Sequence, residues 1–111
     1  MKKKEVIIME KATKLMELKV QKTALTNMIE KLEKEWDVVT EEIHEFKSDI
    51  KVLIAENYDV ESEMKATKRM ARLHGKRQGI QWAIFEIQDE ISTIDKTIID
   101  ITRQIVVDGN F

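Results

Sequence analysis

Isoleucine recurs along the last third of the chain at alternating spacings of four and three residues. The eight positions are Ile80, Ile84, Ile87, Ile91, Ile94, Ile98, Ile101 and Ile105. Because seven residues make nearly two helical turns, this repeat places all eight side chains on one narrow face of a helix. The pattern predicts a helix over about residues 80–107 that packs through this face, which we call the isoleucine ladder.

A second heptad repeat begins at Ile8, and its core positions are all apolar between Leu25 and Leu53. Regularity over more than three heptads is typical of a coiled coil rather than of an ordinary surface helix. Lys22 and Asn57 occupy core positions of this repeat, where a polar residue fixes register and partner number. We predict that the following residues form the core and the oligomerisation surface: Leu18, Leu25, Ile29, Leu32, Trp36, Val39, Ile43, Phe46, Ile84, Ile87, Ile91, Ile94, Ile98 and Ile101.

The two repeats differ in phase by one residue around the segment His74-Gly75-Lys76-Arg77-Gln78-Gly79. Glycine suits the left-handed residue that ends a helix, and no helix breaker precedes Gly75. The sequence therefore predicts an all-α antiparallel helical hairpin, with a long helix over about residues 5–74, a turn at 75–79 and a helix over about 80–107. No Ser, Thr, Asp or Asn caps a helix beginning at Ile80, which leaves a continuous, kinked helix as the alternative.

These predicted helices differ in length, so the apolar stripe of residues 8–45 would lack cover, which a lone helix in water cannot tolerate. One solution is self-association into a multi-helix bundle, most simply a dimer of hairpins that forms a four-helix bundle. The other is a break near residues 37–40, capped by Asp37 or Thr40, that gives a monomeric three-helix bundle. The heptad phase runs undisturbed through residues 37–40, and isoleucine at both core positions favours three or four helices, so we expect self-association, with a homodimer as the simplest form.

Composition agrees with long helices in a single domain. The chain has 111 residues, of which 36% are charged and 42% hydrophobic, and it contains no proline. This balance is typical of coiled coils. We expect one all-helical coiled-coil domain over residues 1–111, with residues 1–4 and 108–111 frayed. The formal net charge of −2 provides no general attraction to nucleic acids or anionic membranes.

Positive charge is concentrated locally between Met64 and Phe85, a stretch that contains no acidic residue. Its cations are Lys65, Lys68, Arg69, Arg72, Lys76 and Arg77. One interpretation is a contact for an anionic partner such as nucleic acid, which would be salt-sensitive and tolerant of sequence. The other is that Lys68, Arg69 and Arg72 compensate the dipole at the end of the long helix.

Several kinds of chemistry are not expected. The chain has no cysteine, which rules out disulfides and thiolate chemistry. Glu41 and His44 have a spacing used in di-iron bundles, but that chemistry needs the motif on two helices. The serines are scattered without a nearby histidine. We therefore expect no enzyme activity, cofactor, metal or small-molecule substrate.

The remaining function is binding. The apolar run Val6–Met9 is too short for a signal peptide or a membrane span, so we expect no membrane association and a cytoplasmic protein. We expect a self-associating adaptor, chaperone or inhibitor of another protein. In composition the chain resembles small Lys/Ile/Glu-rich helical proteins of phages and mobile elements that bind and block host proteins. The alternative is a nucleic-acid-associated protein that uses the basic segment 65–77.

Overall fold

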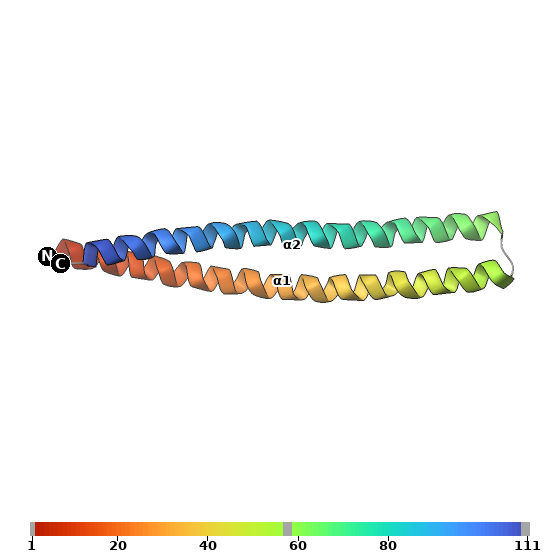
Figure 1. Ribbon diagram of the computed structural model, residues 1–111, viewed down its shortest axis with the longest axis horizontal. Helices are drawn as coiled ribbons and strands as arrows, with labels where there is room; N and C mark the ends of the chain where they lie inside the picture. Colours follow the sequence, from red (N-terminus) through yellow and green to blue (C-terminus); the bar gives the residue numbers. More distant parts are fainter. Residues whose placement is uncertain (1, 57–58, 110–111) are drawn as a thin grey trace. The chain divides into compact units, whose positions relative to one another are not determined.

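The computed structural model describes residues 2–56 and 59–109, and leaves the side chains of Lys2 and Ile54 undescribed. Two long α-helices, α1 (Lys2–Glu56) and α2 (Val60–Gly109), contain all of the described residues except Asp59 (Figure 1). Asn57, at a predicted register position, and Met1, Asn110 and Phe111, in the expected frayed ends, lie outside the described residues. The helices pack antiparallel, which supports the prediction of an all-α helical hairpin.

The chain forms two compact units, and the first combines Met1–Ile29 with Glu86–Phe111. Two ion pairs join its helices: Lys11 Nζ lies 2.6 Å from Asp108 Oδ2, and Lys22 Nζ lies 2.7 Å from Asp95 Oδ1. As the residue number rises in α1 it falls in α2, so the two helices are antiparallel in this unit. Lys22, which occupies a core position of the first repeat, is thus paired with a carboxylate of α2.

The second unit comprises Glu30–Phe85 and contains the best-packed part of the core. Val39, with only 1% of its surface exposed, packs with Ile43 of α1 and Ile80 of α2. Half-buried apolar side chains surround these three: Leu32, Trp36, Met70, Leu73 and Ile84. Phe46 of α1 lies against Arg69 of α2, whereas the earlier Trp36 lies against the later Arg77, so this unit is antiparallel as well.

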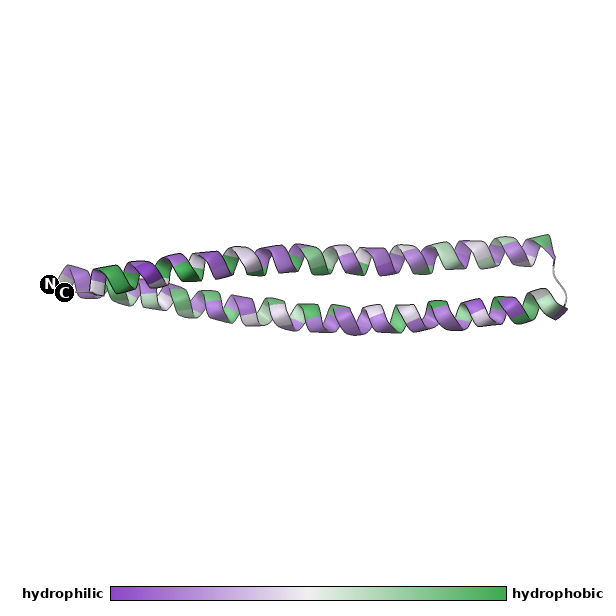
Figure 2. Cartoon of the chain, viewed as in Figure 1, coloured by the Kyte–Doolittle hydropathy of each residue, from purple (hydrophilic) through white to green (hydrophobic). Residues whose placement is uncertain are grey.

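The low-exposure side chains of α1 recur every three or four residues, and Figure 2 shows apolar residues spaced among polar ones along both helices. The buried or half-buried positions from Ile8 onward include Ile8, Lys11, Leu15, Leu18, Lys22, Leu25, Ile29, Leu32, Trp36, Val39, Ile43, Phe46 and Ile50. This spacing keeps one face of α1 toward α2 within each unit. The expectation that the stripe of residues 8–45 lacks cover within the chain is therefore wrong.

The predicted turn at residues 75–79 is also wrong, and with it the predicted bounds 5–74 and 80–107. Gly75 and Gly79 lie inside α2 and neither has a positive φ, whereas the chain reverses between Glu56 and Val60. A glycine inside a helix costs about 1 kcal/mol relative to alanine. Helices of 55 and 50 residues cover each other's apolar faces, which outweighs that cost.

The apparent phase slip came from assigning residues of α2 to the repeat of α1. In α2 the half-buried side chains Ala66, Met70, Leu73 and Arg77 extend the spacing of the isoleucine ladder toward the start of the helix. Met64 and Ala71, which continue the spacing of the first repeat beyond Asn57, are exposed. The isoleucine ladder is therefore the end of a longer stripe and not a separate helix.

The alternative break near residues 37–40 is contradicted as well, because α1 runs through this segment. Thr40 is not a cap, and its hydroxyl is buried without a hydrogen-bond partner among the described residues. At the ends, α1 includes Lys2–Lys4 and α2 includes Asp108 and Gly109, so these residues of the expected frayed ends are helical.

Asp59 caps the start of α2. Its Oδ1 accepts a hydrogen bond of 2.6 Å from the backbone N–H of Ser62, and its carbonyl oxygen accepts one of 3.1 Å from the N–H of Glu63. The backbone N–H of Ser62 stabilises the carboxylate and lowers the pKa of Asp59 below its ordinary value. Glu61 and Glu63 add negative charge to the first turn, where the helix dipole favours it.

Candidate interaction surfaces

The predicted core and oligomerisation residues lie in the seams between α1 and α2, to different depths. Leu18, Val39, Ile43, Phe46 and Ile87 are buried. The others are half-buried: Leu25, Ile29, Leu32, Trp36, Ile84, Ile91, Ile94, Ile98 and Ile101. Only Ile80 and Ile87 of the isoleucine ladder are buried. Two helices alone therefore leave most of the ladder in partial contact with solvent.

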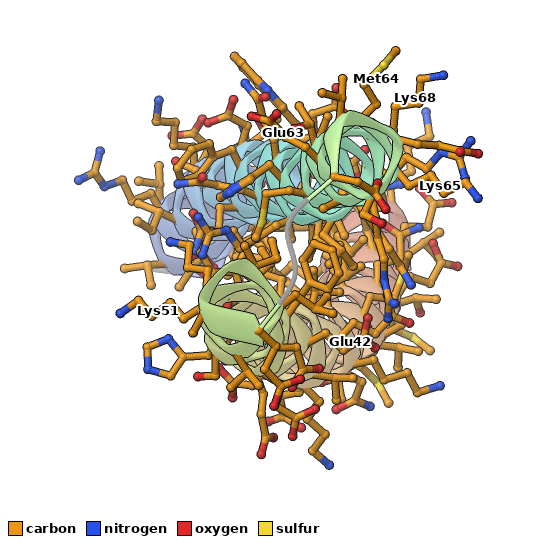
Figure 3. All side chains as sticks on the ribbon, turned by 90° about the vertical axis from the view of Figure 1, so that its right-hand side faces the viewer. Glu42, Lys51, Glu63, Met64, Lys65 and Lys68 are labelled. Carbon is orange, nitrogen blue, oxygen red and sulfur yellow. The ribbon has the colours of Figure 1, made fainter. Side chains whose placement is uncertain are left out.

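The basic segment lies in the first half of α2, and all of its cations except the half-buried Arg77 are exposed. Lys65, Lys68, Arg72 and Lys76 lie along one side of the helix. Figure 3 shows Lys65 and Lys68 pointing away from the helix axes. Lys65 forms an exposed ion pair with Glu61, with its Nζ 3.6 Å from Oε1. Within the described part of the chain, Lys68, Arg72 and Lys76 form no ion pair.

The other two cations of the segment lie over aromatic rings of α1. The guanidinium carbon of Arg69 is 4.7 Å from the ring centroid of Phe46, and that of Arg77 is 5.2 Å from the centroid of Trp36. Such cation–π contacts hold both arginines in the second unit. The interpretation of Lys68, Arg69 and Arg72 as compensation for a helix end is wrong, because no helix ends there.

Sequence reasoning missed these contacts, and it also missed an exposed aromatic pair on α2. The side chains of Trp82 and Phe85 are 60% and 48% exposed. Gly75 and Gly79 precede them in the same helix, and a Cβ added to either glycine would meet no atom within 4 Å. The signal available in the sequence was that Trp82 and Phe85 fall between the positions of the isoleucine ladder, which places them on other faces of the helix.

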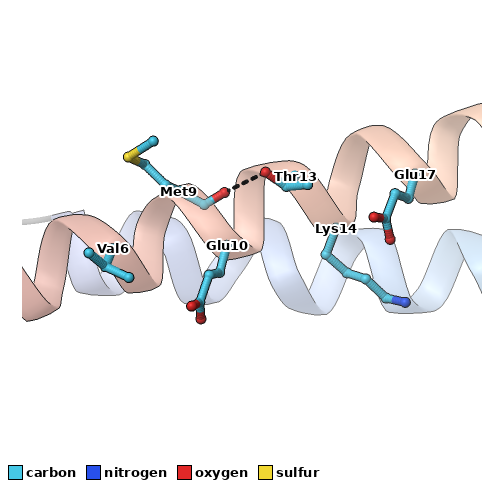
Figure 4. Close-up of a pocket in the computed structure, with 6 residues that line it drawn as sticks. All are labelled: Val6, Met9, Glu10, Thr13, Lys14 and Glu17. Carbon is cyan, nitrogen blue, oxygen red and sulfur yellow. Dashed lines mark hydrogen bonds between the residues drawn. The ribbon is translucent and has the colours of Figure 1, made fainter.

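The surface hollow near the start of α1 does not resemble a catalytic or ligand pocket. Val6, Met9, Glu10, Thr13, Lys14 and Glu17 line it (Figure 4). All six come from consecutive turns of α1, and the hydroxyl of Thr13 donates to the carbonyl of Met9 at 3.0 Å. Polar groups of different elements do not converge there, as they do in most ligand sites.

Among the described residues, no group of three histidine or acidic side chains is placed to hold a metal ion. Glu41 and His44 are both exposed on α1. Neither helix contains, in its described residues, a stretch long and apolar enough to cross a membrane.

Comparison with known proteins supplies no relative: no family model, curated protein or solved structure matches this chain.

Proposed function

We propose that this chain is a non-enzymatic interaction protein that self-associates through its helices and presents the assembled surface to another protein. The observation that carries the proposal is the accessible surface of 8911 Å² for a chain of 13.0 kDa. A compact monomer of this mass exposes about 6,300 Å², so the chain exposes about 40% more. Sixteen large hydrophobic side chains among the described residues contribute to this exposed surface, and association with a second copy would remove part of it from water.

The distribution of apolar side chains supports the same proposal. Large apolar residues that are about half or more exposed occur in both units, including Met16 and Val20 on α1 and Trp82 and Val106 on α2. Contiguous exposed apolar surface in a folded protein marks a contact with another macromolecule. Adaptor, chaperone and inhibitor all remain within this proposal, because each works by presenting a helical surface to a protein partner.

The experiment is thermal unfolding, followed by circular dichroism at two protein concentrations ten-fold apart. If folding and self-association are coupled, mass action stabilises the folded oligomer at the higher concentration. For a dimer we expect the midpoint to rise by about 3 °C per ten-fold increase. A midpoint that does not change with concentration would contradict the proposal.

Nucleic-acid binding is the second candidate, and the exposed cations Lys68, Arg72 and Lys76 favour it. Arg69 and Arg77 lie over rings of α1 and Lys65 has a carboxylate partner, so half of the predicted contact is already engaged within the chain. Three phosphate contacts would give weak, salt-dependent binding. Failure of DNA and RNA columns to retain the protein at low salt would exclude this candidate.

A further inference from the structure

Trp82 exposes a large aromatic side chain on the face of α2 opposite the isoleucine ladder, and Phe85, about one turn later, exposes another beside it. Trp82 lies two residues from both Ile80 and Ile84, which turns it through about 200° from the isoleucine ladder. With 60% and 48% of their surfaces exposed, Trp82 and Phe85 are only partly covered within the second unit. Such a pair is the usual centre of a protein–protein contact.

The same face carries small residues about two and four turns earlier. Gly75 precedes Trp82 by seven residues and Ala71 precedes Phe85 by fourteen, so each lies in line with its aromatic residue along the helix. Glycine destabilises the interior of a helix relative to alanine. Neither Gly75 nor Gly79 has a positive φ, and no described atom comes within 4 Å of the Cβ that each lacks. Nothing within the chain uses their small size.

Charge changes sign along this face at the same point. Lys68 lies seven residues before Gly75, and Arg72 lies seven before Gly79. Because α2 continues as one helix, both lines extend beyond the glycines. Glu86 lies seven residues after Gly79 on the line of Arg72, and Asp89 lies seven residues after Trp82 on the line of Lys68. Between Lys68 and Asp89 the face is therefore small and basic before residue 78 and aromatic and acidic after residue 79.

We propose that a second copy of this chain docks on this face, with the two α2 helices antiparallel about a two-fold axis between Gln78 and Gly79. The proposal rests on the proposed self-association and names the surface that performs it. Antiparallel pairing about this axis places Trp82 over Gly75 of the second copy. It places Phe85 over Ala71 of the second copy, so that large side chains meet small ones.

The same symmetry brings opposite charges together. Lys68 faces Asp89 of the second copy, and Arg72 faces Glu86 of the second copy. Each of these contacts occurs twice, because a two-fold interface uses the same surface patch on both chains. Size and charge are thus both self-complementary about one point on α2, which identifies a second copy as the occupant.

A single cysteine near the axis tests the geometry directly, since the chain contains no cysteine. In the full-length variant Gln78→Cys, the two thiols of a dimer face each other across the axis, and we expect a disulfide-linked dimer under mild oxidation. Ser92→Cys is the matched control on the same line of the helix. Antiparallel pairing separates its two copies by about 40 Å, so no cross-link is expected. Cross-linking of both variants indicates parallel pairing, and cross-linking of neither indicates another face; both results would overturn the proposal.

Charge reversal provides an independent test on exposed residues that do not affect the core. We expect Lys68→Glu and Asp89→Lys each to raise the dimer dissociation constant, by roughly two- to thirty-fold over the two symmetric pairs. The double variant restores attraction and should return the constant close to that of the original chain. Trp82→Ala should raise it by at least about 30-fold. Single and double variants that all dimerise normally would overturn the proposal.

These outcomes also distinguish a wrong choice of surface on α2 from a failure of the proposed self-association itself. A dimer that forms no Gln78→Cys cross-link and ignores charge reversal would overturn the α2 surface alone and leave self-association standing. An unmodified chain that stays monomeric at every concentration would overturn both.

Discussion

Thr40 carries a buried hydroxyl without a hydrogen-bond partner among the described residues. Six other threonines donate to the carbonyl four residues earlier: Thr13, Thr23, Thr26, Thr93, Thr97 and Thr102. An unsatisfied buried hydroxyl costs about 1–3 kcal/mol, and valine has nearly the same shape without it. We expect Thr40→Val to raise the free energy of unfolding by about 1 kcal/mol, measured by urea denaturation.

Thr26→Val is the matched control, because the hydroxyl of Thr26 is exposed and bonded to the carbonyl of Lys22 at 2.9 Å. Its free energy of unfolding should change by no more than about 0.5 kcal/mol. A Thr40→Val variant that is no more stable than the original chain would show that the hydroxyl is satisfied.

Two single lysines, Lys11 and Lys22, form ion pairs where α1 and α2 meet. Lys11 and Lys22 interrupt the apolar stripe of α1, and each meets an aspartate of α2 in the first unit. Ion pairs that remain partly open to solvent, as these do, add little to stability. Their effect is on register, because sliding one helix by a turn would leave these cations facing apolar side chains.

Among the elements, the start of α2 depends on the carboxylate of Asp59. Hydrogen bonding from Ser62 lowers the pKa of Asp59 in the folded chain below 3.8. A lowered pKa means that the cap contributes fully above the ordinary pKa and loses its contribution as pH falls through the lower folded value. Asp59→Asn keeps an acceptor oxygen but does not titrate, so its thermal midpoint should fall less between pH 5 and pH 2, roughly the window of this titration, than that of the original chain.

Asp59→Ala is the companion variant, because it removes the acceptor at every pH and should lower the thermal midpoint even at neutral pH. Equal pH dependence in the original chain and in Asp59→Asn would show that this carboxylate does not cap α2.

The glycines of α2 give a direct test of where the chain reverses. The amides of residues 75–79 lie in the interior of a continuous helix, where hydrogen bonds protect them. We expect these amides to exchange with deuterium as slowly as those of neighbouring turns of α2, measured by nuclear magnetic resonance. Fast exchange confined to residues 75–79 would restore the turn that the sequence suggested.

Periodicity made the helical class predictable, because a repeat of three and four residues places the apolar side chains on one face of a helix. The antiparallel pairing was predicted from a turn, and the turn lies between Glu56 and Val60 rather than at residues 75–79. The position of the turn was harder, because two glycines and three preceding cations, Lys68, Arg69 and Arg72, imitate a helix end. The opposing signal was Asp59 followed by the acidic first turn Val60–Glu63, a helix start that deserved more weight than Gly75. The basic side of α2 was predicted from spacing. The stacking of Arg69 and Arg77 was not, because it depends on which residues face each other across the seam.

For the whole molecule, the functional proposal depends on how few apolar side chains the core buries and how many remain exposed. Only six apolar side chains among the described residues are buried, and just one, Val39, is almost fully enclosed. A core this small supports a folded domain poorly when the chain stands alone. The proposed association of two copies would add buried apolar area, and we expect the partner surface on the faces of the assembled helices that the pairing leaves open.

Absolute mass in solution, by size-exclusion chromatography with light scattering at two concentrations, tests self-association without any variant. One chain weighs 13.0 kDa, so the dimer proposed from the exposed surface weighs 2 × 13.0 = 26.0 kDa. We expect the dimer mass at the higher concentration, with a decrease toward one chain only on strong dilution. A folded, helical protein of 13.0 kDa at both concentrations would contradict it.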